Sequence, residues 1–207
     1  MRVNGSIKGF QKGTLYLQHI EEGEYLTLDS LPMNSTTYFE LGCNIDEAEL
    51  LFLSLSEEAT AERISFFATE GVTSIKTTLK RFKFDAKING GPQQSLLESY
   101  YKNLRLFKNQ KLEFIEEKIS AQLDSNATLA NEIQLQIDNV TRRSYLYSIN
   151  FAINNKDSEV APYIALAEIH DANIKYLDTI NKVLTPAIAK SKYGLILADY
   201  IETIKPE

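Results

Sequence analysis

The sequence has few of the residues that enzymes and metal proteins use for chemistry. Its 207 residues contain one cysteine, two histidines and no tryptophan. A single cysteine excludes an intramolecular disulfide, a CxxC redox pair and a cysteine-rich zinc site. His19 and His170 are far apart in the chain, and neither belongs to an HExxH motif or a Ser-His-Asp order. We therefore expect a non-enzymatic protein with no catalytic residue, no cofactor and no metal.

Long apolar runs and clustered basic residues are also missing. No stretch reaches the roughly 18 apolar residues of a membrane-spanning helix, so we expect no membrane-spanning segment. The formal net charge of -6 argues against nucleic acid as a partner, because that binding depends on clustered Lys and Arg. The group Lys80, Arg81 and Lys83 fits the solvated face of a strand better than an anion site.

The glycines divide the chain into two halves. Eight of the nine lie in the first 91 residues, and only Gly194 lies beyond. Between them are short runs rich in β-branched and aromatic residues: RVNGSIKG, GTLYLQHI, EYLTLDSL, TYFELG, AELLFLSL, RISFFAT, VTSIKTTL and FKFDAKIN. Eight such runs, one about every ten residues, predict an antiparallel sandwich or barrel.

After Gly91 the apolar period becomes that of a helix. Two series step by three and four residues: Leu97, Tyr101, Leu104, Leu112, Ile115, Ile119 and Leu123, then Ile133, Ile137, Val140, Ser144, Tyr147 and Phe151. They predict two long antiparallel helices joined near DSNAT. Shorter helices are expected over residues 158–172, 174–189 and 192–204, with Ser158 as an N-cap and Pro186 bending or ending its helix.

These patterns together predict an α+β protein. An antiparallel β-sandwich of about eight strands is expected over residues 1–90, and a helical bundle over residues 91–207. A ligand or a partner protein could bind in the groove between the two halves, because domain junctions often hold ligands. Strand addition at an exposed sheet edge is the competing mode.

A few polar residues in the first half have both a functional and a structural interpretation. Asp29, beside Ser30, could be a ligand or a base, but an Asp that closes a turn by bonding to backbone N–H groups is the better explanation. Cys43 lies in the apolar context FELGCNI, so we expect a buried thiol. Gly90 and Gly91 could cradle an anion, although a tight entry turn into the helix explains them better.

Four tyrosines form the candidate binding surface. Tyr100 and Tyr101 follow the junction, and Tyr145 and Tyr147 lie on the second long helix. Neighbouring tyrosines cannot both face one core, so one of each neighbourhood should be partly exposed, where an aromatic ring with a polar tip suits binding. The alternative is packing in the core with the hydroxyls at its rim.

Several phrases resemble a known family, and the resemblance covers nearly the whole chain. They are NGSIKGFQKGTLYLQHI, the triplet LDS at residues 28–30, FFATEGVTSI and INGGPQQSLLESYY. They are similar to domain-of-unknown-function family 4369, in which a small β-sandwich begins with an I-x-G-x-I-x-G strand and later carries an F-x-x-x-G-x-I hairpin before a helix.

The resemblance implies a Bacteroidota protein exported to the periplasm or cell envelope, often as a lipoprotein. Many members carry a C-terminal thioredoxin-like domain. Here Thr37, Tyr38 and Phe39 replace the usual G-x-F, no cysteine near the N-terminus can accept a lipid, and there is no CxxC motif. We therefore expect no redox activity from these residues.

The expected role is that of a non-catalytic envelope protein that binds a partner protein or a small ligand. The alternative is an accessory domain of a thiol-disulfide oxidoreductase system whose thioredoxin-like module is absent or acts in trans.

Overall fold

The computed structural model describes residues 1–21 and 23–205, which form eight strands followed by six helices. The chain divides into two compact units, Met1–Leu97 and Glu98–Glu207. The α+β class, with N-terminal sheets and C-terminal helices, is confirmed. The unit boundary lies inside the first long helix, a little beyond the boundary expected at residue 90.

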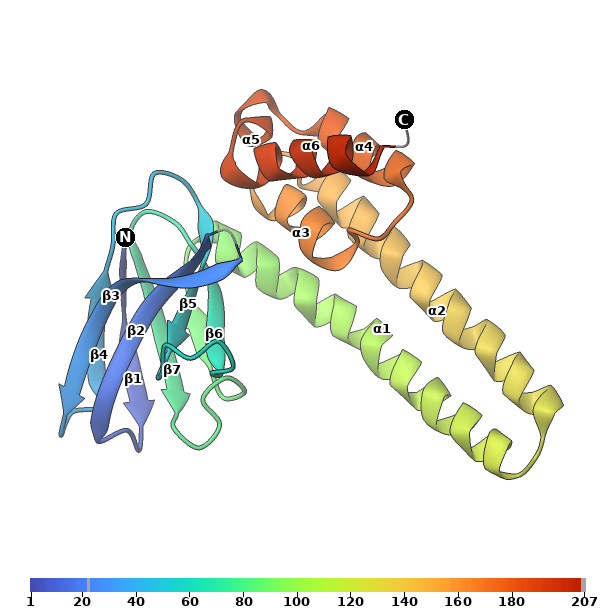
Figure 1. Ribbon diagram of the computed structural model, residues 1–207, viewed down its shortest axis with the longest axis horizontal. Coiled ribbons are helices and arrows are strands. Elements are labelled where there is room, and N and C mark those ends of the chain that lie inside the picture. Colours follow the sequence, from blue (N-terminus) through green and yellow to red (C-terminus); the bar gives the residue numbers. More distant parts are fainter. Residues whose placement is uncertain (22, 206–207) are drawn as a thin grey trace. The chain divides into compact units, whose positions relative to one another are not determined.

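The first unit contains two four-stranded sheets (Figure 1). One sheet has the order β4 (Tyr38–Gly42), β1 (Arg2–Lys8), β7 (Val72–Thr78) and β8 (Lys87–Asn89). The other has the order β3 (Glu24–Asn34), β2 (Lys12–Glu21), β5 (Glu49–Ser54) and β6 (Arg63–Ala68). Each of the eight predicted runs contains a strand, but the last begins only at Lys87 because residues 80–85 form a turn. Lys80, Arg81 and Lys83 thus lie in a turn and not on a strand.

One pair of neighbouring strands differs from the expected antiparallel arrangement. β1 pairs with β4 in antiparallel fashion but with β7 in parallel. In the parallel pair Gly5 lies opposite Ile75. A Cβ atom on Gly5 would lie 1.7 Å from the Ile75 carbonyl oxygen, so only glycine permits this approach. The sandwich is therefore mixed, and the prediction of a wholly antiparallel one was wrong for this pair.

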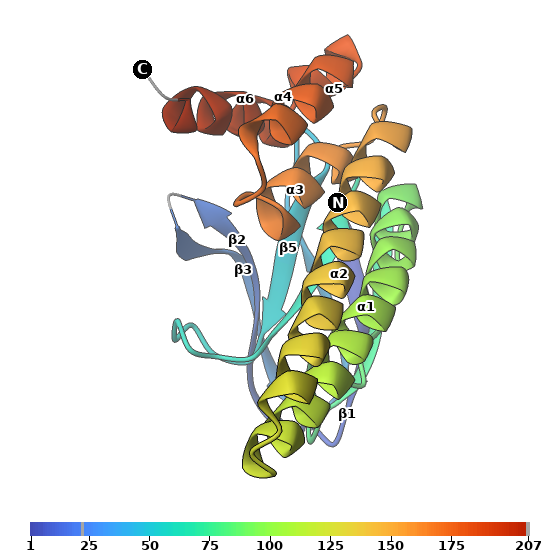
Figure 2. The ribbon, with the colours of Figure 1, turned by 90° about the vertical axis from the view of Figure 1, so that its right-hand side faces the viewer.

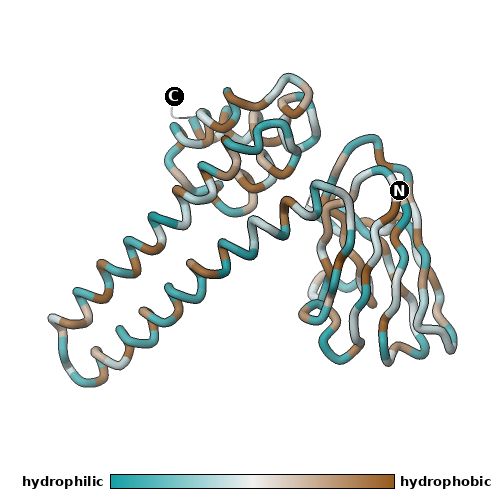
Figure 3. Tube along the Cα trace, turned by 180° about the vertical axis from the view of Figure 1, so that it is seen from behind, coloured by the Kyte–Doolittle hydropathy of each residue, from teal (hydrophilic) through white to brown (hydrophobic). Residues whose placement is uncertain are grey.

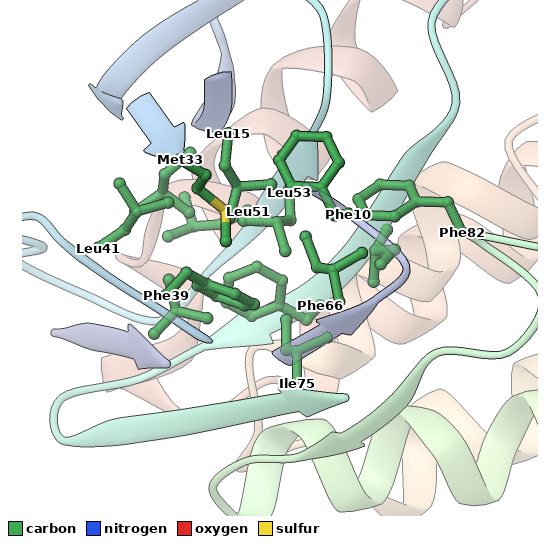
Figure 4. Packing of buried hydrophobic residues seen from close by; sticks show 14 of the residues in the cluster. Phe10, Leu15, Met33, Phe39, Leu41, Leu51, Leu53, Phe66, Ile75 and Phe82 are labelled. Atoms are coloured by element: carbon green, nitrogen blue, oxygen red, sulfur yellow. The ribbon is translucent and has the colours of Figure 1, made fainter. Parts of the chain in front are cut away.

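Apolar side chains from both sheets fill the space between them (Figure 4). Phe39 and Ile75 come from the first sheet, and Leu15, Leu51 and Phe66 from the second. All five are 1% exposed or less. Alternation along the strands places these side chains on the inner faces, which is the arrangement of a β-sandwich.

The second unit contains most of a helical hairpin. α1 (Pro92–Leu123) and α2 (Ala127–Asn154) lie side by side and run in opposite directions (Figures 1 and 2). The Asn126 side chain accepts the Leu129 N–H bond and so caps the start of α2. The two long helices and their junction near DSNAT are confirmed.

The predicted buried face is right for α2 and partly wrong for α1. On α2 the series begins with Ile133, Ile137 and Val140, and all three are buried. On α1 the members Leu112, Ile119 and Leu123 are 55%, 51% and 80% exposed. A three-four spacing identifies an apolar stripe, but it does not show what covers that stripe.

Four shorter helices complete the second unit: α3 (Val160–Glu168), α4 (Ile174–Val183), α5 (Pro186–Ala189) and α6 (Lys192–Ile204). Pro186 is the first residue of α5, so the helix expected over residues 174–189 is divided there. The N-cap of α3 is Glu159 and not Ser158, but the Ser158 hydroxyl still accepts the Val160 N–H bond at 3.2 Å, which is the kind of contact expected of it. In the described part of the chain, no helix is long and apolar enough to cross a membrane.

Candidate functional site

Tyr100 and Tyr101 have different surroundings near the start of α1. Tyr100 is fully buried, and its ring stacks on that of Tyr147 with centroids 5.4 Å apart. Its hydroxyl oxygen lies 2.7 Å from that of Ser148. Tyr101 is partly exposed, so one member of this neighbourhood is buried and the other is not, as expected. Burial raises the pKa of both phenols.

Tyr145 is the candidate tyrosine with a directed polar contact at the surface. It is partly exposed on α2, and its hydroxyl donates a hydrogen bond of 2.6 Å to Asp171 Oδ1. Asp171 lies between α3 and α4. The hydrogen bond to this carboxylate favours the protonated phenol and raises the pKa of Tyr145 to about 12.

This pair lies in a surface cavity of about 480 Å³ within the second unit. The apolar part of the lining comes from Leu146, Ile149 and Ala172. The polar part comes from Asp138, Thr141, Arg142, Tyr145, Asp171, Asn173 and Tyr176. A lining that combines apolar surface with convergent polar groups is usual for a ligand site. We call this cavity the Tyr145 hollow.

A second cavity of about 190 Å³ adjoins the Tyr145 hollow and shares Thr141 and Tyr145 with it. Lys108 and Glu168 line it and form an ion pair at 3.2 Å. Tyr145 is therefore accessible from two adjacent depressions. Of the four candidate tyrosines, it is the one that lines both, whereas Tyr100 has no exposed surface.

Asp29 has a structural role in the first unit. Its Oδ1 accepts the Ser30 N–H bond at 2.8 Å, and its Oδ2 accepts the Gly42 N–H bond at 2.9 Å. Bonding to backbone N–H groups is as expected, but Asp29 lies within β3 and not in a turn. It links β3 to β4, which belong to different sheets.

Cys43 was expected to be buried, but the structure leaves it partly exposed. It lines a depression together with Met1 and Glu70. Desolvation by its surroundings raises the pKa of the thiol. The lower fraction of thiolate disfavours a nucleophilic role.

The two histidines lie in different units, as the sequence indicated. His19 Nδ1 is 3.9 Å from Glu49 Oε2 in the first unit, and the His170 carbonyl accepts the Tyr200 hydroxyl in the second. Over residues 1–21 and 23–205, no three His, Cys, Asp or Glu side chains form a group that could hold a metal ion.

Arg63 connects several groups of the first unit, although no role was expected for it from the sequence. It is 7% exposed, and its Nε donates to Gln18 Oε1 at 3.1 Å. Its other N–H groups donate to the carbonyls of Glu58, Ala59 and Ala61. The guanidinium carbon lies 3.7 Å from the centroid of the Tyr25 ring. An arginine at the start of the apolar run RISFFA was the available signal.

The outer edge of β6 is covered by the first turn of α1. The Phe67 N–H donates to Gln94 Oε1 at 2.7 Å, and Gln94 is buried. Gly91 lies close to this contact, where a Cβ atom would be 2.6 Å from Thr69 Oγ1. This close approach agrees with the tight entry turn expected at Gly90 and Gly91, and it leaves β6 a poor edge for strand addition.

Comparison with curated proteins and with solved structures found no match to this chain. Comparison with family models found a match over residues 1–97, which is the extent of the first unit. The matching family is described as Domain of unknown function (DUF4369). Residues 1–97 therefore match the DUF4369 family, and this match covers less of the chain than the nearly complete one expected from the sequence.

Proposed function

We propose that the protein is a non-catalytic binding module of the cell envelope, and that the Tyr145 hollow holds its ligand. The observation that carries the proposal is the Tyr145–Asp171 hydrogen bond within a partly apolar cavity. The hydrogen bond from the phenol fixes the position of the carboxylate before a ligand binds. Less conformational entropy is then lost on binding than with a freely rotating side chain.

The charges around the hollow favour a cationic group on the ligand. Two carboxylates, of Asp138 and Asp171, and one guanidinium, of Arg142, line the cavity. Leu146 and Ile149 provide an apolar surface beside them. This combination suits a Lys or Arg side chain of a partner protein, because such a side chain has an apolar stem and a charged end.

Photo-crosslinking in cells tests where the partner binds. A photoreactive phenylalanine analogue at Tyr176, which is 43% exposed and lines the hollow, should capture a protein. The matched control is Tyr38, which is 57% exposed in the first unit. Equal capture at both positions, or none at Tyr176, would refute the assignment to the hollow.

Charge variants then test the chemistry of the ligand. Asp171→Asn should reduce capture at Tyr176 about 10-fold, because a charge-assisted contact is lost. Arg142→Gln should leave capture unchanged or strengthen it. The opposite ranking would show an anionic ligand and contradict the proposal.

The envelope location is part of the same proposal and rests on what the resemblance of the first unit to DUF4369 implies. Fractionation of cells that express the native gene tests it. Recovery with periplasmic or membrane proteins supports the location, and recovery with cytosolic proteins contradicts it. The inter-unit groove and a role beside a thioredoxin-like module remain predictions, and the raised pKa of the Cys43 thiol gives the latter no support.

A further inference from the structure

The part of the hairpin nearest the α1–α2 turn has as many large apolar side chains outside as inside. Its own core consists of Ala121, Ala130, Ile133 and Ile137, with Phe114 and Ile115 packed against them. Outside lie Ile119, Leu123, Leu129 and Leu135, which are 42% to 80% exposed. Figure 3 shows apolar positions repeated along both helices. Exposed apolar surface of this kind marks an interaction site.

Three of the exposed side chains form one stripe on α1. Leu112, Ile119 and Leu123 are separated by seven and four residues, so they lie on the same side of the helix. Lys118 and Tyr100 mark the side of α1 that meets α2, because their side chains hydrogen-bond Gln134 and Ser148 of α2. The three apolar residues lie on a different side of α1. We call these three residues the α1 stripe.

The charges of the hairpin are segregated along its length. Residues 113–138, the turn half, contain six acidic side chains and one basic one, and so carry -5. Residues 98–112 and 139–154, the open half, contain six basic side chains and one acidic one, and so carry +5. Residues 113 and 138 lie at about the same level, because the Lys118–Gln134 and Tyr100–Ser148 contacts define the register. Soluble surfaces usually intersperse the two signs.

Among the described residues of the unit, one ion pair joins the open half to a carboxylate outside the hairpin. Lys108 of the open half pairs with Glu168 of α3. In the turn half, Lys118 hydrogen-bonds an uncharged side chain, that of Gln134. The sign changes between Lys111 and Glu113, on either side of Leu112 in the α1 stripe.

We propose that a second copy of this chain covers the α1 stripe, so that two hairpins pair antiparallel across a two-fold axis near Leu112. The acidic turn half of each copy then lies along the basic open half of the other. A two-fold interface must be complementary to itself, and a hairpin with opposite charges on its two halves satisfies this condition when reversed. Leu112 meets its own copy at the axis, Ile119 and Leu123 lie against the open half of the other copy near residues 105 and 101, and the charges select the direction.

Sedimentation of the full chain tests whether the dimer exists. At 100 mM NaCl the protein should be a dimer at micromolar concentration, and raising the salt to 500 mM should weaken association several-fold, because exposed charges are screened. A monomer at 100 μM, or a dimer indifferent to salt, would overturn the proposal.

Two matched variants test which surface is used. Ile119→Glu introduces a charge into the stripe and should weaken association at least about 10-fold. Leu135→Glu makes the same change on α2, outside the stripe, and should leave the dimer intact. Both side chains are more than half exposed, at 51% and 65%, so both variants should fold, and circular dichroism checks this. Equal effects, or none from Ile119→Glu, would refute the stripe.

Spin labels test the direction of pairing in a Cys43→Ala background. Asn103 lies in the open half and Gln122 in the turn half, and both are exposed. A mixture of Asn103→Cys and Gln122→Cys chains, each carrying a label, should give a short distance between copies. Each label paired with itself should give a long one, since every residue from the axis adds about 3 Å between copies. The reverse pattern would show parallel pairing and contradict the proposal.

Discussion

The hydroxyl groups of Tyr100 and Ser148 lie 2.7 Å apart inside the helical hairpin. The Ser148 hydroxyl also lies 3.0 Å from the Ser144 carbonyl, to which it donates its only proton. Tyr100 must therefore be the donor in the first bond. The pair joins α1 to α2 and leaves neither hydroxyl without a partner.

Removing the two hydroxyls one at a time should have unequal effects. Tyr100→Phe removes a donor and leaves Ser148 bonded to Ser144, so the free energy of unfolding should fall by about 1 kcal/mol. Ser148→Ala leaves a buried phenol without an acceptor and should cost about 2 kcal/mol. Urea unfolding of the helical unit, followed by circular dichroism at 222 nm, measures both. If Ser148→Ala costs less than Tyr100→Phe, the assigned direction is wrong.

Arg63 should be essential to the stability of the first unit, although it does not line the cavity that we propose as the binding site. Arg63→Lys cannot reproduce the forked contacts to Gln18 and to the 58–61 backbone. We expect a loss of about 3 kcal/mol in unfolding free energy and faster proteolysis between residues 55 and 62.

The control for Arg63 is Arg81→Lys. Arg81 pairs with Asp85 at 3.4 Å on the surface, with 64% of its side chain exposed. A surface pair contributes little, so this change should stay within about 0.5 kcal/mol of wild type. Similar effects of the two substitutions would show that the buried contacts contribute no more than surface ones.

Gly5 should tolerate no side chain. Gly5→Ala forces a methyl group against the Ile75 carbonyl and should separate β1 from β7, at a cost of about 3 kcal/mol or more. Ser6→Ala, one position along the same strand, should change stability by less than about 0.5 kcal/mol. Thermal unfolding of both variants makes the comparison. A stable Gly5→Ala protein would show that the two strands can pair at a greater separation.

The Tyr145 phenol should ionise at a higher pH than an ordinary tyrosine. Its pKa is raised to about 12 by the hydrogen bond to Asp171, so little phenolate should form at pH 11. In Asp171→Asn the pKa should fall towards 10, and absorbance at 295 nm should show more phenolate at pH 11. An unchanged titration would mean that the Asp171 contact does not form in solution.

The same shift predicts a loss of stability at high pH. The unfolded phenol ionises near pH 10 while the folded one still holds its proton, so the unfolded state binds fewer protons above that pH. The contribution of the Tyr145–Asp171 pair is complete below about pH 10 and is lost as the pH rises towards 12. Asp171→Asn should flatten this part of the stability curve.

Cys43 should react slowly with thiol reagents. Its thiol is partly covered and its pKa is raised by desolvation, so alkylation at pH 7.5 should be slower than that of an exposed cysteine. An Asn44→Cys, Cys43→Ala protein provides that comparison, because Asn44 is an exposed neighbour. Faster reaction at Cys43 would favour the redox-accessory alternative.

The sequence by itself determined the local elements. Turn-forming glycines between runs of β-branched residues predicted all eight strands, although the last begins at residue 87 and not 82, and the three-four spacing after Gly91 predicted two long helices. Ser158, Pro186 and the Asn126 region act through their own backbone neighbours, so their roles could be read locally. Local patterns suffice where the interacting groups are close in the chain.

Only the tertiary structure decided which distant groups meet. The parallel pairing of β1 with β7 joins residues about seventy positions apart, and nothing in either strand shows its neighbour. Tyr145 and Asp171 form the candidate site because the segment after α3 returns to α2, and Arg63 is buried because the 58–61 backbone turns towards it. The α1 stripe had the spacing of a core face but lies outside. A periodic sequence predicts that one face of a helix is apolar, and packing decides whether this chain or another one buries that face.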